Sequence, residues 1–128
     1  MPYVHSDLIE VRRIPKKGRG VFARRHIRKG TVIERVPVIL VSMKEVFSQA
    51  PRSKLADYVF IRDRDTVAVV LGYGSLYNHS YQPNAQYYDS GRHTQVFEAI
   101  RDIRPGEEIT VNYNGSATDR RQVGFRVA

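Results

Sequence analysis

The chain consists of short apolar segments separated by polar turns. Residues 31–36 alternate between apolar and polar side chains, as a half-buried strand does, and residues 67–70 form the most apolar run of the sequence. Residues 85–88 and 94–100 are strand-like and flank Asp89-Ser90-Gly91-Arg92, which is typical of a hairpin turn. Because strand-like segments and turns follow one another at close intervals, the pattern predicts a mostly β domain.

Two further features set the expected boundaries of elements. Pro37 has no backbone N–H, so we expect it to end ladder pairing after residues 31–36 or to place that strand at an edge, with a separate short strand at 38–41. Ser42 precedes helix-forming residues and predicts one or two helical turns. Residues 55–61 are interpreted as another strand.

The composition limits the class of protein. A chain of 128 residues with 41% hydrophobic and 27% charged residues is expected to form one soluble globular domain. It has no apolar stretch of membrane-spanning length and no signal-like N-terminus, so we expect an intracellular protein without a membrane partner; cytoplasm and nucleus or nucleoid stay open. With no cysteine, and four histidines that lack ligand spacing, no metal site is expected.

The net charge of +8, with a pI near 10.0, has two interpretations. Basic residues can be spread over a solvated surface, or they can attract a polyanion such as nucleic acid or an acidic protein. They do cluster early in the chain, at residues 12–13, 16–17 and 24–29. No aromatic-interleaved recognition motif accompanies them, so composition leaves both interpretations open.

The chain's most unusual stretch directly follows the apolar run at 67–70. Gly72 and Gly74 permit unusual backbone angles, and Asn78-His79-Ser80 supplies three hydrogen-bonding side chains. Pro83 then disfavours helical geometry at the residue before it. Such a polar segment after a buried strand forms either an elaborate turn or a site.

Two other stretches resolve this choice when they are read together with the first. Gly18-Arg19-Gly20-Val21-Phe22-Ala23 is a glycine-rich turn entering an apolar segment, and residues 106–113 lead from a Pro-Gly turn into a strand ending on Tyr113. In this order, and with Asn78-His79-Ser80 and Pro83-Asn84 between them, the motifs resemble those of the SET-domain family of lysine methyltransferases. The resemblance spans about residues 8–115 and leaves a short tail, 116–128, within a single domain covering 1–128.

The resemblance implies a β-clip fold of several small curved sheets with short helices. It also implies that the C-terminal segment passes beneath a loop as a pseudoknot, which brings the motif at 78–84 and the motif at 106–113 together. The implied activity is methyl transfer from S-adenosylmethionine to a lysine amine in a narrow channel.

The chemistry of lysine explains what such a site must provide. Lysine has a reference pKa of about 10.4, so at pH 7 its nucleophilic neutral form is scarcer by about 3.4 log units, or roughly 4.6 kcal/mol. A dry channel and a nearby cation lower that pKa, and alignment of the reacting atoms supplies the rest. The site therefore needs walls and oriented dipoles more than a strong base.

The resemblance assigns roles to individual residues. It makes Tyr113 the catalytic residue, while Asn78 and His79 contact the methyl donor and the backbone of the glycine turn approaches its carboxylate. The full implied cofactor set is Lys17, Gly18, Arg19, Gly20, Tyr77, Asn78, His79 and Phe125. The aromatic residues expected to line the substrate channel are Tyr58, Tyr73 and Tyr113, with Phe60, Tyr77 and Tyr87 as further candidates.

Each of these residue types also has an ordinary structural role. His79 can be a buried histidine that satisfies a neighbouring carbonyl, Asn78 can form a local turn, and Tyr113 can pack at a strand end. Glu107 and Glu108 are adjacent on a strand and point to opposite faces, so they are not expected to form a catalytic pair. Glu108 is expected to be a structural anchor.

The sequence departs from the family in one respect that affects its partners. Many relatives have a zinc-binding cysteine where this chain has Tyr81, so Phe125 in the tail is our candidate for a lid, and a homodimer is an alternative source of missing walls.

The expected protein substrate is histone-like or ribosomal. A non-catalytic module that binds S-adenosylmethionine, peptide or nucleic acid is the competing hypothesis. The candidates for an acidic substrate groove are Asp57, Asp63, Asp65, Glu98, Asp102, Glu107 and Glu108.

Overall fold

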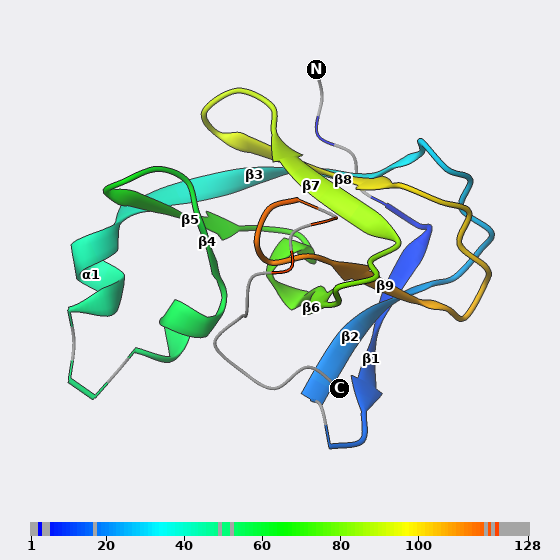
Figure 1. The fold of residues 1–128 in the computed structure, drawn as a ribbon, viewed down its shortest axis with the longest axis horizontal. Coiled ribbons are helices and arrows are strands. Elements are labelled where there is room, and N and C mark those ends of the chain that lie inside the picture. The colour runs from blue at the N-terminus through cyan, green and yellow to red at the C-terminus, as the bar shows by residue number, and fades with distance from the viewer. Residues whose placement is uncertain are drawn as a thin grey trace.

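The computed structural model describes residues 3, 6–16, 18–48, 50–51, 53–116, 118 and 120. Within this part of the chain the protein consists mainly of two curved β-sheets with only short helices, as Figure 1 shows. The prediction of a mostly β fold is therefore confirmed. No helix in the described ranges is long and apolar enough to cross a membrane.

The smaller sheet has the strand order β1-β2-β9-β6. Its strands are β1 (Ile9–Ile14), β2 (Gly18–Ala23), β9 (Glu108–Val111) and β6 (Asn78–His79). Strands β1, β2 and β9 pair antiparallel, whereas β6 pairs with β9 in parallel. This sheet thus combines the glycine turn at its start with both late motifs, although they are far apart in sequence.

The larger sheet has the order β4-β5-β3-β8-β7. Its strands are β4 (Val59–Ile61), β5 (Thr66–Val70), β3 (Val32–Ser42), β8 (Thr94–Ala99) and β7 (Ala85–Asp89). The expected hairpin is confirmed, because β7 and β8 pair from Ala85↔Ala99 to Asp89↔Gln95. The main core contains buried side chains from both sheets, including Val21, Ile33, Phe97 and Ile109.

Pro37 does not end its strand, contrary to our prediction. Strand β3 runs through it and is central in the sheet, because Pro37 lies where β3 changes partner. Up to Pro37, β3 pairs with β8, and from Val38 onward it pairs with β5. The missing N–H of proline is tolerated at this change of partner, while the Pro37 carbonyl accepts a hydrogen bond from the Leu71 N–H at 3.1 Å.

The predicted strand at 55–61 is also partly wrong. Residues Lys54–Asp57 form a 3₁₀ helix, η1, and only Val59–Ile61 form a strand. The Ser53 side chain caps η1 by accepting from the Leu55 N–H at 3.2 Å. Ala56 then packs in a second apolar cluster with Val46, and this burial favours a helical turn over an extended segment.

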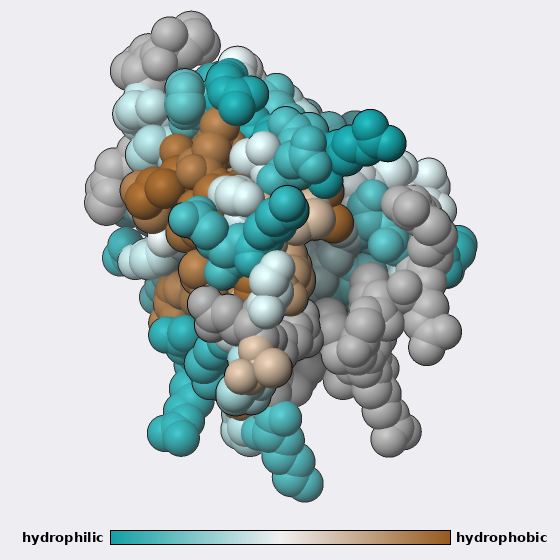
Figure 2. Space-filling view, turned by 90° about the vertical axis from the view of Figure 1, so that its left-hand side faces the viewer, coloured by the Kyte–Doolittle hydropathy of each residue, from teal (hydrophilic) through white to brown (hydrophobic). Residues whose placement is uncertain are grey.

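The helix after Ser42 is confirmed as α1 (Met43–Phe47), although the Ser42 side chain makes no capping hydrogen bond. A second 3₁₀ helix, η2, spans Gly74–Leu76. Helices α1 and η1 lie at one side of the molecule, beside β4 and β5 (Figure 1). Apolar side chains gather on this side in Figure 2, and its exposed residues include Ile39, Phe47, Leu55 and Ile61.

Candidate active site

The two late motifs meet in the smaller sheet, as the resemblance implied. Asn78 pairs with Thr110 and His79 with Val111, and the Ser80 N–H donates to the Val111 carbonyl at 3.0 Å. This parallel ladder is very short, so other contacts must hold it. It brings the end of one motif alongside the strand that leads to Tyr113.

The buried side chain of Asn84 supplies the strongest of these contacts. Its Nδ2 donates to the Glu108 carbonyl at 2.8 Å and to Glu107 Oε2 at 3.2 Å, while its Oδ1 accepts from the Thr110 N–H at 2.9 Å. The residue is only 1% exposed, so no water competes for these bonds. One amide group thus fixes the loop after β6 to strand β9.

Tyr113 follows β9 and is held at three points. Its hydroxyl donates to the Tyr77 carbonyl at 2.5 Å, its N–H donates to His79 Nδ1 at 3.0 Å, and its carbonyl accepts from the Tyr87 hydroxyl at 3.2 Å. Burial, reinforced by the negative charge of Glu108, raises the pKa of the Tyr113 phenol to about 12. The phenol therefore stays protonated at neutral pH and acts as an orienting dipole rather than as a base.

His79 has its imidazole next to this tyrosine. The ring is 7% exposed and packs edge-on against Tyr81, with ring centroids 4.4 Å apart. Burial lowers the pKa of His79, which favours the neutral imidazole that its acceptor role at Nδ1 requires. The Nδ1 atom thus bonds a backbone N–H rather than the carbonyl that the structural alternative expected, and the contact of His79 with a cofactor stays a prediction.

Asn78 connects the late motifs to the glycine turn. Its Nδ2 donates to the Arg19 carbonyl at 2.9 Å and to Glu108 Oε2 at 2.7 Å. A Cβ atom at Gly20 would lie 2.5 Å from Glu108 Oε2 and 3.0 Å from Asn78 Nδ2, so only glycine allows this approach. Gly18, at φ +92°, also has a backbone that favours glycine.

The described members of the implied cofactor set therefore come together from two segments of the chain. Gly18, Arg19 and Gly20 lie on β2, beside Asn78, which Tyr77 and His79 flank in the sequence. Lys17 and Phe125, which complete the set, lie outside the described residues. Glu107 and Glu108 point to different partners, as expected: Glu107 binds Arg101, whereas Glu108 anchors Asn78.

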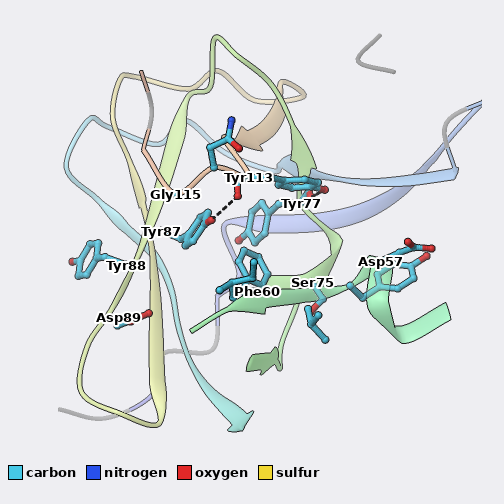
Figure 3. Close-up of a pocket in the computed structure, with 13 residues that line it drawn as sticks. Asp57, Phe60, Ser75, Tyr77, Tyr87, Tyr88, Asp89, Tyr113 and Gly115 are labelled. Atoms are coloured by element: carbon cyan, nitrogen blue, oxygen red, sulfur yellow. Dashed lines mark hydrogen bonds between the residues drawn. The ribbon is translucent and has the colours of Figure 1, made fainter. Parts of the chain in front are cut away.

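A pocket of about 660 Å³ opens beside Tyr113, and Figure 3 shows the side chains around it. Its aromatic wall includes Phe60 and Tyr87, whose ring centroids are 4.8 Å apart in an edge-to-face contact. The residues that line the pocket are Asp57, Tyr58, Val59, Phe60, Ile61, Ser75, Tyr77, Tyr87, Tyr88, Asp89, Tyr113, Asn114 and Gly115. The pocket is thus largely aromatic, with Tyr113 at its wall.

This lining can be compared with the predicted channel. Tyr58 and Tyr113 lie there, as do the further candidates Phe60, Tyr77 and Tyr87, whereas Tyr73 is not among the lining residues. Of the proposed acidic groove only Asp57 lies at the pocket. Asp89, which sequence reasoning missed, is also there, with its carboxylate 3.4 Å from the Arg62 guanidinium.

A buried carboxylate behind the pocket was also missed. Glu34 is 4% exposed and accepts from the Tyr77 hydroxyl at 2.7 Å and from the Tyr73 N–H at 3.1 Å. The Tyr77 ring stacks on Phe97 at 4.5 Å, and burial followed by the Glu34 charge raises its pKa well above the ordinary value. Tyr77 therefore presents its backbone carbonyl, rather than its hydroxyl, to Tyr113.

Comparisons with known proteins agree with this geometry. The profile of the SET domain matches residues 18–114. A Schizosaccharomyces pombe protein named histone-lysine N-methyltransferase, H3 lysine-37 specific, is 32% identical over 114 residues, which cover 88% of this chain and 77% of the relative. A solved Plasmodium falciparum structure, provisionally described as a histone methyltransferase, has a TM-score of 0.72 and 27% identity, covering 88% of this chain and 97% of the other.

Proposed function

Because the chain belongs to the SET-domain family, we propose that it is an S-adenosylmethionine-dependent protein-lysine methyltransferase acting on a basic, histone-like protein. The observation that carries this proposal is the position of Tyr113. Its hydroxyl is fixed by the Tyr77 carbonyl at the wall of an aromatic pocket, while its backbone is fixed by His79 and Tyr87.

The residues around the glycine turn fit the methyl donor. At Gly20 the Glu108 and Asn78 side chains occupy the space that a Cβ atom would need, so β2 and the late motifs pack closely together, whereas the space beside Gly18 is open to a ligand. We infer that Gly18, Arg19, Gly20, Asn78 and His79 would hold it, with Lys17, Tyr77 and Phe125 as further predicted contacts. When bound, S-adenosylmethionine supplies the methyl group.

The pocket residues supply the other requirements of the reaction, which are a neutral lysine amine and its alignment. Aromatic walls from Tyr58, Phe60 and Tyr87 exclude water, which lowers the pKa of an inserted lysine amine and favours its neutral, nucleophilic form. The Tyr77 carbonyl and the Tyr113 phenol are oriented dipoles that can align the amine. Since the Tyr113 phenol stays protonated, the lysine loses its proton before attack rather than to this residue.

The histone-like substrate rests on two observations. The S. pombe relative is named for lysine methylation of histone H3, and Asp57 and Asp89 place carboxylates at the pocket, where they favour a basic peptide. The homodimer and the intracellular location stay predictions from the sequence.

The test is transfer of a tritiated methyl group from S-adenosylmethionine to histones, ribosomal proteins and a cell lysate. We expect label in lysine after hydrolysis, and a loss on the order of 10²-fold with Tyr113→Phe, because the amine loses an aligning group. Tyr3→Phe is the matched control, since Tyr3 is 54% exposed and lies outside the pocket. Donor affinity is measured for all three proteins.

Two outcomes would contradict the proposal. Donor binding without transfer to any substrate would favour the non-catalytic binding module. Full activity in Tyr113→Phe would remove Tyr113 from the mechanism.

A further inference from the structure

The charge of this protein is divided unevenly between two parts of the fold. Residues 6–31 and 100–116, which build β1, β2, β9 and their loops, contain ten described Lys and Arg and five Asp and Glu, a net charge of +5. Residues 32–99, which include all strands of the larger sheet, contain six described basic and seven acidic residues, a net charge of −1. The basic excess therefore belongs to one end of the molecule.

The carboxylates at that end already have partners. Glu10 binds Arg12 and lies 3.8 Å from Arg24, Asp7 lies 3.8 Å from Arg25, and Glu107 binds Arg101. Asp102 accepts from the Lys29 backbone N–H, and Glu108 from Asn78. None of these carboxylates forms an ion pair with the other basic side chains of this end.

Six exposed basic side chains lie outside these ion pairs, and we call them the basic end. They are Arg13, Lys16, Arg19, Arg28, Lys29 and Arg104. None of them forms an ion pair with a described carboxylate. Arg13 and Arg19 are directly opposite each other on β1 and β2, an arrangement of like charges that is unfavourable unless an anion lies between them.

The topology brings these residues to one side. In Figure 1 the β1–β2 hairpin lies below and to the right of the centre, and the loops that follow β2 and β8 lie at the right edge, away from β4, whose residues line the pocket. Ile27 and Ile103 exchange backbone hydrogen bonds of 2.9 and 2.8 Å, so Arg28 and Arg104 come from adjacent loops. A six-residue strand such as β1 spans about 20 Å, so the basic end reaches along several phosphates of a nucleic acid.

We propose that the basic end binds the phosphate backbone of duplex DNA. Arginine and lysine at spaced positions match phosphates, and such binding needs no base contact. Of the large exposed hydrophobic residues of the described chain, only Tyr113 lies within residues 6–31 and 100–116, and it lines the pocket. The basic end therefore offers no aromatic platform for single-stranded bases, no apolar anchor for a membrane and no apolar centre for a protein interface.

This surface is separate from the pocket and shares only Arg19 with the proposed methyl-donor site, so its binding does not depend on methyl transfer. It gives the protein a second point of attachment, so that a lysine on a DNA-bound protein is presented while the basic end holds the adjacent duplex. It also explains how a chain with a charge of +8 can approach a basic substrate, because DNA supplies the opposite charge.

The test is fluorescence anisotropy of a labelled duplex, titrated with the full chain at several salt concentrations. We expect a Kd of about 1 to 100 μM near physiological salt, with no preference between two unrelated sequences. Each lost phosphate contact lowers the slope of log K against log salt by about 0.9, so R13Q/K16Q/R28Q should reduce the slope by about 2.7.

The matched control is K44Q/K54Q/R64Q, which removes the same charge from exposed residues of the other part of the fold. It should leave the slope unchanged. Three results would each overturn the proposal. They are an equal reduction of the salt slope in both variants, absence of duplex binding at low salt, and tighter binding of a single-stranded oligonucleotide than of the duplex. The affinity for S-adenosylmethionine, measured in parallel, should stay the same in both variants. A failure of the DNA-binding proposal is therefore distinguishable from a failure of the proposed methyl transfer.

Discussion

His79 links the protonation state of one ring to the position of the proposed catalytic residue. Its Nδ1 can accept the Tyr113 N–H only while it carries no proton, and burial lowers the pKa that controls this state. The unfolded chain has a histidine pKa of about 6.5, so below that pH the unfolded state binds more protons than the folded state. His79 thus makes its full contribution to stability above about pH 6.5, and loses it as the pH falls further towards the folded pKa.

We therefore predict that the urea midpoint falls between pH 7.5 and pH 5.5, and that His79→Asn reduces this dependence. Asparagine keeps an oxygen acceptor near the Tyr113 N–H without a titrating ring. His93→Asn is the control, because His93 is exposed and the variant should retain the pH dependence of the original chain. If the urea midpoint falls equally with pH in all three proteins, groups other than His79 cause the pH dependence.

At the scale of elements, the contact of β6 with β9 depends on Asn84. The two strands share only two residue pairs, and the Asn84 amide adds three hydrogen bonds in a buried position. Asn84→Ala should lower the free energy of unfolding by about 2 to 4 kcal/mol, because it leaves buried backbone groups without partners. Donor affinity should fall with it, since Asn78 lies on β6.

Urea unfolding and donor titration check this prediction. Gln86→Ala is the comparison, because the half-buried Gln86 makes a single side-chain bond, to Glu98 at 3.2 Å, and its loss should cost less than about 1 kcal/mol. A similar small effect for Asn84→Ala would mean that the β6–β9 contact is held by other groups.

The elements that could be predicted from the sequence are those with a strong local signal. The hairpin around Gly91 and the buried strand β5 follow from turn chemistry and apolar runs. Pro37 was misread because its tolerance depends on a change of strand partner, which no local pattern reveals. The helical turn at Lys54–Asp57 likewise depends on packing of Ala56 against residues distant in sequence.

The residues of the candidate site likewise include some that the sequence predicted and some that it did not. Motif spacing led to Tyr113, Asn78 and the glycine turn, which the fold brings together. Glu34 could not be identified, because its burial depends on a β-bulge between Val32 and Glu34 that turns both Ile33 and Glu34 inward. Asp89 was missed because a hairpin residue next to a turn is usually solvated, and only the topology places it at the pocket.

At the scale of the whole molecule, the division of charge separates two kinds of electrostatic interaction. The carboxylates that line the pocket are those of Asp57 and Asp89, and Asp89 is partly neutralised by Arg62. At the other end, six basic side chains are available for phosphates. Salt should therefore weaken methylation of a free basic peptide only modestly, but weaken capture of a DNA-attached substrate strongly.

This leads to a prediction that joins the two proposals. A lysine peptide tethered covalently to a short duplex should be methylated with a higher kcat/KM than the same peptide alone. Raising salt from 50 to 200 mM should remove about 40-fold of that advantage if three phosphate contacts are made, because log K falls by about 0.9 per contact for each tenfold rise in salt. Steady-state kinetics on both substrates measure it, and the covalent tether prevents salt from simply releasing the peptide from DNA.

The variants proposed for DNA binding decide what such a result means. R13Q/K16Q/R28Q should lose most of the advantage of the tethered peptide and keep the rate on the free peptide, because these residues lie away from the pocket. K44Q/K54Q/R64Q should keep both the advantage of the tethered peptide and the rate on the free peptide. If salt reduces kcat/KM equally for the free and the tethered peptide, the basic end does not take part in substrate capture. The pocket would then be the sole determinant of substrate choice.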